Sequence, residues 1–197
     1  MPIVHLLSVR SYWSNELGFP IIQNTLNRDQ FEKIRKFIHF NENQKHLSRD
    51  DSNCDRLHKL RSTIDILNKY VASILFEQNL SIDEEMCVTK FRHYMKQYML
   101  NKSYKWGFEL FVHADISGYA YNFEVYSGQE YILKKLITEP DFGLSSNVFI
   151  RLSRRIPRSE NHKLYFDNYY TALPLMVHLA NTGIHTLGTV RRNRIPE

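Results

Sequence analysis

Two aspartates stand out because each lies in a stretch that otherwise has the character of a buried strand. Asp83 is found in LSIDEEM, residues 80–86, and Asp167 is found in YFDNYY, residues 165–170. Carboxylates on neighbouring strands could hold two divalent ions about 3.5–4 Å apart, as in-line attack on a phosphodiester requires. Hard oxygen ligands favour Mg²⁺ over zinc. The pair therefore predicts a magnesium-dependent site for phosphodiester chemistry, provided that the fold brings the two residues together.

The strands and helices expected around these aspartates would place them on adjacent strands. Aromatic and β-branched residues predict three strands, and the short connection ISG makes the second and third antiparallel. A helical crossover then leads to a fourth strand that ends in Asp167, and a strand reached in this way lies parallel to its partner, about 4.8 Å away. A helix stopped at Gly183 and a last short strand follow. The expected order is strand 79–87, strand 106–115, strand 119–127, helix 144–156, a strand within 162–170, a helix within 171–185, and a short strand that runs into a basic tail within 186–194.

In the first part of the chain the apolar residues repeat at helical spacing rather than at strand spacing, so this part is predicted to be mainly helical. Apolar residues at helical spacing indicate one amphipathic helix over 27–40, with Asn27 as its N-cap, and a longer helix over 57–74. We therefore expect a partial helical domain over residues 1–76, with roles in dimerisation or DNA binding, and an α/β domain over residues 77–197.

Composition permits a globular protein with a real core. The 197 residues are 43% hydrophobic and 24% charged, and their net charge of +5 suits a polyanionic partner without demonstrating one. The only two cysteines lie far apart, which argues against a disulfide framework or a zinc module and for a reducing compartment. No apolar run approaches the roughly 18 residues of a membrane span, so no membrane partner is expected.

Seven stretches in order resemble the piggyBac-type transposases, and together they cover nearly the whole chain. Each motif is weak alone, but coincidence becomes improbable when all seven occur at compatible spacing. They are YWSNELGFPII at 12–22, RDQFEKIRKFIHFNEN at 28–43, LSIDEEM at 80–86, KQYMLNKSYKWGFELFV at 96–112, YNFEVYSG at 121–128, YFDNYYTALPL at 165–175 and GTVRRNR at 188–194.

The resemblance implies a ribonuclease-H-like catalytic domain that cleaves and joins DNA strands. Asp83 and Asp167 match the first two of the family's three metal-binding carboxylates, which implies a two-ion Mg²⁺ site. The resemblance further implies that the DNA partners are transposon ends and TTAA target sites, and that the protein is located in the nucleus. It also allows for a homodimer. Without it, Asp83 would be interpreted as a solvent-facing carboxylate.

The family's third catalytic aspartate lies beyond the GTVR-like strand, and this sequence ends at Glu197 without it. Asp115 is expected to serve a turn instead, because antiparallel pairing carries it away from Asp83, and Glu85 would be a weak substitute. Two aspartates would leave two Mg²⁺ ions underneutralised, so we expect little strand cleavage from this chain alone. The alternative is a noncatalytic DNA-binding or protein-binding remnant of a transposase.

Basic residues supply the candidate DNA contacts, although a run of charge is often only a solvated face. Such a face is the favoured interpretation for Arg151, Arg154, Arg155 and Arg158 around the crossover helix. The family resemblance favours phosphate contacts for the other positions. These are Lys90, Arg92, Lys102, Lys105, Arg191, Arg192 and Arg194.

Overall fold

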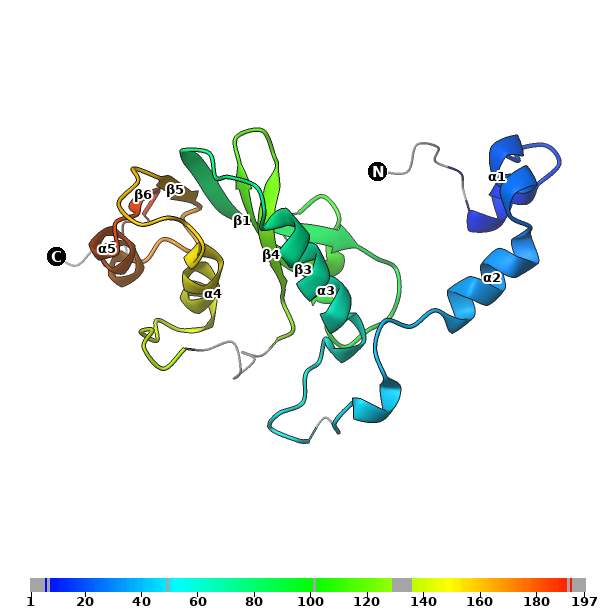
Figure 1. The fold of residues 1–197 in the computed structure, drawn as a ribbon, viewed down its shortest axis with the longest axis horizontal. Helices are drawn as coiled ribbons and strands as arrows, with labels where there is room; N and C mark the ends of the chain where they lie inside the picture. The colour runs from blue at the N-terminus through cyan, green and yellow to red at the C-terminus, as the bar shows by residue number, and fades with distance from the viewer. Residues whose placement is uncertain are drawn as a thin grey trace. The chain divides into compact units, whose positions relative to one another are not determined.

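The computed structural model describes residues 6, 8–48, 50–100, 102–128, 136–190 and 192. The chain forms two compact units, residues 1–42 and 43–197, and each is described by itself. Figure 1 shows their helices and strands. This structural division does not test the predicted division into functional domains at residues 76 and 77, which stays a prediction.

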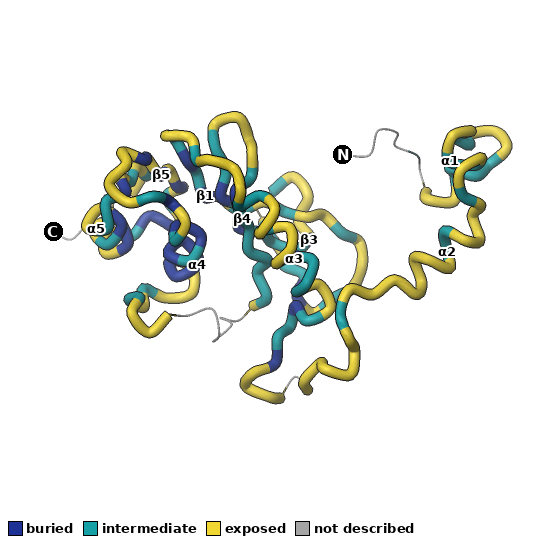
Figure 2. Tube along the Cα trace, viewed as in Figure 1, coloured by how far each residue is buried: buried dark blue, intermediate teal, exposed yellow. Residues whose placement is uncertain are grey.

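The first unit contains a 3₁₀ helix, η1 (Val9–Trp13), and two short helices, α1 (Pro20–Thr25) and α2 (Arg28–Phe37). Asn27 caps α2 as predicted, because its Oδ1 accepts a hydrogen bond of 2.8 Å from the Gln30 backbone N–H. Trp13 holds the unit together: its Nε1 donates to the Leu26 carbonyl at 2.7 Å, and its ring lies 5.2 Å from that of Phe31. None of the described residues in this unit is fully buried (Figure 2).

The second unit holds a mixed sheet with helices on both faces. Its elements follow the predicted order, with a 3₁₀ turn and a short strand in addition. They are η2 (Asn43–Lys45), α3 (His58–Val71), β1 (Asn79–Val88), β2 (Gln97–Tyr98), β3 (Trp106–Asp115), β4 (Ala120–Val125), α4 (Leu144–Ser153), β5 (Lys163–Phe166), α5 (Leu173–Asn181) and β6 (His185–Gly188).

The sheet has the strand order β2-β3-β1-β5-β6, and β4 also pairs with β3. As predicted, β3 and β4 form an antiparallel hairpin; its turn contains Gly118, whose φ of 82° lies in the left-handed region that glycine tolerates. The parallel pairing expected between the strands that carry the two aspartates is also confirmed, since β1 pairs with β5. β5 in turn pairs with β6 in parallel.

The two faces of the sheet are covered differently. On one face Leu80 and Ile82 of β1 and Leu164 and Phe166 of β5 are buried in a core with α4 and α5, which the dark segments of Figure 2 mark. Side chains alternate along a strand, so Asp83 belongs to the other face. On that face α3 packs beside β4, in a smaller cluster built on Leu57, Ile64 and Met95, with Phe108, Phe123 and Val125 against it.

Candidate active site

A groove of about 580 Å³ lies where β1, β5 and β6 run side by side, and both predicted aspartates line it. Asp83 and Asp167 are exposed, so their carboxylates are accessible from solution. The groove lies at the carboxyl ends of β5 and β6, where ligands of parallel strands commonly bind, and beside the middle of β1. The lining residues are Ser81, Ile82, Asp83, Tyr165, Phe166, Asp167, Leu187, Gly188 and Thr189.

Strand register explains how residues so distant in sequence reach the same groove. The parallel ladder between β1 and β5 pairs Ser81 with Tyr165, and two further steps along each strand arrive at Asp83 and Asp167. In the next strand, Gly188 pairs with Phe166. A Cβ at Gly188 would lie 2.5 Å from the Thr171 hydroxyl, so only glycine permits this close approach beside the groove.

Local backbone contacts orient both carboxylates. Asp83 Oδ1 accepts a hydrogen bond of 2.8 Å from the N–H of Glu84, and Asp167 Oδ1 accepts one of 2.5 Å from the N–H of Asn168. The carbonyl of Asp167 also accepts the Thr171 hydroxyl at 2.8 Å, and the Thr171 side chain is buried, which fixes the turn from β5 into α5. Contacts that fix one carboxylate oxygen leave the other available, the usual role of groups that orient metal ligands.

A second acidic cluster lies on the opposite face of β1. Glu84 pairs with the buried Phe111, so its side chain points away from the side of Asp83. Burial raises the pKa of Glu84, the neighbouring Asp83 raises it further, and Lys102 opposes both. Burial likewise raises the pKa of Glu109, and burial together with the charge of Glu84 raises the pKa of the Tyr170 hydroxyl. None of these three groups lines the groove.

Neither of the other carboxylates considered from sequence joins the aspartate pair. Asp115 pairs with Leu80 and accepts hydrogen bonds from the Ser117 hydroxyl at 2.6 Å and the Tyr119 N–H at 2.9 Å, which confirms its turn role. Those bonds, led by that of Ser117, lower the pKa of Asp115. Glu85 is exposed and does not line the groove. Across the described residues, no group of three or more His, Cys, Asp or Glu could hold a metal ion.

Comparison with known proteins decides the family. The family described as Transposase IS4 matches residues 1–197. The chain belongs to this transposase family. It is 25% identical over 194 residues to human PiggyBac transposable element-derived protein 3, and 27% identical over 192 residues to the human derived protein 2. Each alignment covers 94% of this chain and 31% of the relative, so the chain spans about a third of these relatives' length.

The fold agrees with this assignment to piggyBac-type transposases. A cryo-EM structure of a piggyBac transposase synaptic complex with hairpin DNA superimposes with a TM-score of 0.79. The match is 21% identical in sequence and covers 96% of this chain and 39% of that one. The predicted ribonuclease-H-like α/β fold is thereby confirmed, and the chain is a transposase-derived domain of the piggyBac type.

The basic residues predicted to contact DNA fall into three groups in this transposase domain. Lys90, Arg92, Lys105 and Arg192 are exposed, and none forms an ion pair within the part of the chain that the structure describes. Arg191 and Arg194 lie outside the described residues. Lys102 is different, because its Nζ lies 3.4 Å from Glu84 Oε1 and donates to the Glu84 carbonyl at 3.3 Å.

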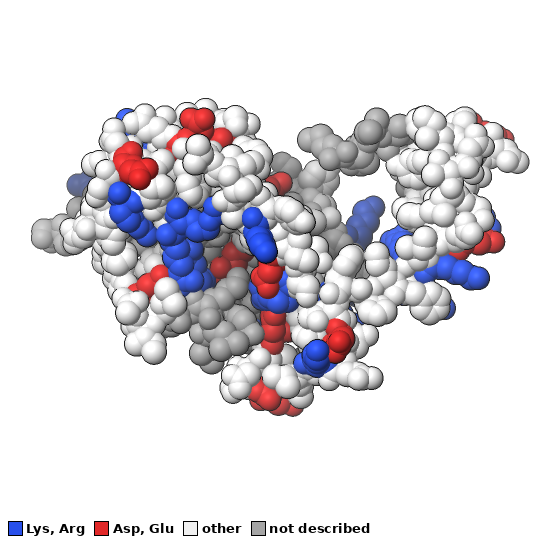
Figure 3. Space-filling view, in the orientation of Figure 1, with Lys and Arg blue, Asp and Glu red and all other residues white. Residues whose placement is uncertain are grey.

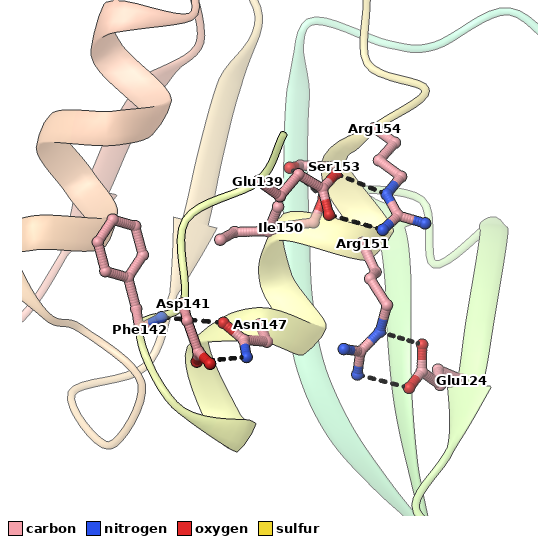
Figure 4. A network of polar contacts seen from close by, with 9 residues as sticks. All are labelled: Glu124, Glu139, Asp141, Phe142, Asn147, Ile150, Arg151, Ser153 and Arg154. Atoms are coloured by element: carbon pink, nitrogen blue, oxygen red, sulfur yellow. Dashed lines mark hydrogen bonds and ion pairs between the residues drawn. The ribbon is translucent and has the colours of Figure 1, made fainter. Parts of the chain in front are cut away.

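The solvated face expected from sequence is wrong for Arg151 and Arg154, which form partly buried ion pairs within the unit, whereas Arg155 and Arg158 are exposed as expected. Arg151 pairs with Glu124 of β4 at 2.8 Å, and Arg154 pairs with Glu139 at 2.6 Å, each through two hydrogen bonds (Figure 4). Arg155 donates to the carbonyls of Tyr121 and Ala72, and Arg158 donates to the Thr182 hydroxyl. In Figure 3 basic and acidic side chains are likewise interspersed over the visible face of this unit.

Sequence reasoning missed several residues that shape the groove. Tyr165 and Leu187 line it and are partly exposed, and Thr189 follows the end of β6. The signal was present for Tyr165, because it alternates with the buried Leu164 and Phe166 and so must share a face with Asp167. Leu187 and Thr189 carried no such signal until the parallel pairing of β5 and β6 was known.

Among the described residues, no helix is both long and apolar enough to cross a bilayer.

Proposed function

We propose that this chain contributes two metal-binding carboxylates and a DNA-binding surface to a piggyBac-type transposase site that cleaves and joins DNA strands. The observation that carries the proposal is the shared groove, which Asp83 and Asp167 reach from adjacent parallel strands. Carboxylates that line one groove, are accessible and are oriented by local hydrogen bonds have the donor chemistry that Mg²⁺ prefers.

The two aspartates would hold Mg²⁺ through the oxygens that their backbone contacts leave available. When bound, the metal would activate the attacking oxygen and stabilise the leaving oxygen of a phosphodiester. Asp83 and Asp167 act in this scheme as ligands and orient the site. Glu84 is held on the opposite face by Lys102, which keeps a further carboxylate away from the incoming phosphate.

Two carboxylates do not complete such a site. We propose that a third ligand comes from outside the described residues, which offer no group of three metal-binding side chains. By itself the chain should bind divalent ions weakly and show little cleavage, because two aspartates cannot balance the charge of two Mg²⁺ ions. This same observation favours a second candidate function, DNA binding without catalysis.

DNA is the proposed partner in either case. The piggyBac structure that shares this fold contains hairpin DNA. Four of the predicted contact residues are exposed and form no ion pair among the residues that the structure describes. Lysine and arginine contacts to phosphates give affinity without reading the base sequence. A preference for TTAA, a nuclear location and a homodimer remain predictions from the family resemblance.

The test is a titration of Mn²⁺ into the purified chain with a TTAA-containing duplex present. Asp83→Ala and Asp167→Ala should each weaken metal binding about tenfold or more, because each removes one of two ligands. Asp65→Ala is the matched control, since Asp65 is an exposed aspartate on α3. Metal affinity equal in all four proteins would refute the metal site and leave DNA binding as the function to study.

A further inference from the structure

A stretch without any acidic residue separates the aspartate-bearing part of β1 from the middle of β3. Residues 86–108, called here the acid-free segment, contain no Asp or Glu. They contain Lys90, Arg92, Lys96, Lys102 and Lys105. Lys102 forms an ion pair with Glu84, which lies outside the segment. The other four basic residues have no acidic residue within the segment with which to pair. Such a surface is complementary to a polyanion.

Two aromatic rings of this segment contact each other at the sheet edge. Tyr98 of β2 pairs with Trp106 of β3, and their rings are tilted by 56° with centroids 4.8 Å apart. Lys96 Nζ lies 5.2 Å from the centroid of the Trp106 ring, within the range of a cation–π contact. Both aromatic residues are nevertheless 50% exposed, so the ring pair is not buried in a core.

Further large rings in the segment are more exposed still. Phe91 is 70% exposed and Tyr104 is 69% exposed. Single exposed apolar residues are ordinary on a protein surface, but several in one short basic stretch indicate a binding surface. A partner that fits must carry both negative charge and flat apolar faces.

We propose that the acid-free segment binds unpaired DNA nucleotides, with bases stacking on Trp106 and Tyr98 and phosphates contacting Lys96 and its basic neighbours. Every base has a π-face, so stacking on aromatic side chains tolerates any sequence, and a basic surface follows the backbone. Duplex DNA would use the cations but not the rings, because its bases are already stacked. This inference deepens the proposed function and rests on DNA being the substrate.

Strand geometry relates this surface to the groove. The N–H of Thr89 donates to the Trp106 carbonyl at 3.3 Å, so Trp106 lies opposite a residue six positions along the chain from Asp83. At about 3.3 Å per residue, that separation is about 20 Å. Alternation along β3 places Trp106 on the same face as Val112, the partner of Asp83. Unpaired bases here would therefore belong to DNA flanking the scissile phosphate, about six stacked nucleotides away.

The experiment compares a fluorescent single-stranded oligo-dT with a duplex of equal length, by anisotropy and without divalent ions. Trp106→Leu and Tyr98→Leu should each weaken oligo-dT binding about tenfold while changing duplex binding less than about twofold. Tyr70→Leu is the matched control, because Tyr70 is 75% exposed on α3, outside the acid-free segment. Trp106→Phe retains a ring and should keep most of the affinity.

Several outcomes would overturn the inference. Equal losses on oligo-dT and duplex would mean that the surface only contacts phosphates, and no loss would mean that the rings serve another purpose. Tighter binding to anionic lipid vesicles or to poly-glutamate than to oligo-dT would point to a different partner. If Trp106→Leu fails to fold, a fluorescence measurement takes its place. The chain has two tryptophans, so in Trp13→Phe the remaining signal comes from Trp106, and oligo-dT should quench it.

The same assay separates this inference from the proposed metal chemistry. Oligo-dT binding is measured without divalent ions, so its outcome does not depend on the metal site, whereas the Mn²⁺ titration tests that site directly. If the Mn²⁺ titration shows no metal site but the ring variants weaken oligo-dT binding, only the proposed chemistry is refuted. If the metal site is found but the ring variants bind oligo-dT as the wild type does, only the stacking surface is refuted.

Discussion

The second unit contains two basic regions that look alike in sequence and differ in structure. Around α4, Arg151 and Arg154 pair with carboxylates and Arg155 donates to carbonyls of the same unit. The side chains of Arg151 and Glu124 are only 8% and 15% exposed. In the acid-free segment, Lys90, Arg92 and Lys105 are exposed and lie beside exposed aromatic rings. Positive charge therefore stabilises the fold in the first region and remains available for a partner in the second.

The difference shows that the local supply of acids decides what a basic residue does. Glu124 and Glu139 come to α4 from β4 and from the segment that precedes the helix, and the planar guanidinium suits their paired oxygens. The acid-free segment has mostly lysines and no internal acid. Lys102 marks the boundary, because it belongs to the segment but reaches Glu84.

The largest effect should follow from breaking the pair between Arg151 and Glu124. Arg151→Met leaves the partly buried Glu124 carboxylate without its partner, and we expect a loss of about 1–3 kcal/mol in the free energy of unfolding. Urea denaturation followed by circular dichroism measures it, with Arg158→Met as a milder control because Arg158 only donates to the Thr182 hydroxyl. A loss below that of Arg158→Met would show that the α4 pair is not structural.

Exposed cations should behave in the opposite way. Replacing Lys90 and Lys105 by Gln should reduce the salt dependence of duplex binding by about one unit of slope per phosphate contact. The free energy of unfolding should change by no more than about 0.5 kcal/mol, because neither side chain is buried. Affinity measured across salt concentrations tests this, with the exposed Lys69→Gln on α3 as control. An unchanged slope in the double variant would remove these lysines from the DNA surface.

A change at Lys102 tests whether this residue stabilises the fold, like the α4 arginines, or contacts phosphates, like the other lysines of the acid-free segment. Lys102→Gln removes the contact with Glu84, so we expect a loss of about 1 kcal/mol in unfolding free energy and almost no change in salt slope. The pair is partly exposed, which keeps the expected loss small. A drop in slope equal to that of Lys105→Gln, with unchanged stability, would instead return Lys102 to the group of phosphate contacts.

The smallest effect concerns pH. Hydrogen bonds from Arg154 hold the pKa of Glu139 below its ordinary value near 4.5. The stability from this pair is therefore present above about pH 4.5 and is lost as the pH falls through the folded-state value. Glu139→Gln should make urea midpoints fall less steeply with acid than in the wild type. Identical slopes in the two proteins would show that the pair does not titrate with folding.

The sequence was enough to predict the pairing that matters for the aspartates. Strand periods and a helical crossover implied that β1 and β5 are parallel neighbours, which the ladder from Asn79 to Ser81 confirms. Their roles as metal ligands came from the family resemblance and stay a prediction. Glu84 could also be assigned to the opposite face, because alternation along a strand depends only on position.

Other features depended on contacts that no local pattern reveals. β2 has two residues and α1 has six, too few for a periodic signal. The Arg151–Glu124 pair joins residues 27 positions apart through the packing of α4 on β4. Lys102 resembled its neighbours in sequence, and only the fold showed that Glu84 lies within reach. Long-range pairing of this kind requires the tertiary structure.

The decisive measurement is a double-mutant cycle on Mn²⁺ binding with Asp83→Asn, Asp167→Asn and the double variant. If the two aspartates hold the same ion in one groove, each single change should weaken binding about tenfold or more, and the double variant should lose little beyond either single one. Asp65→Asn should bind as the wild type does. Independent, fully additive effects, or no effect at all, would contradict a shared metal site between the middle of β1 and the carboxyl end of β5.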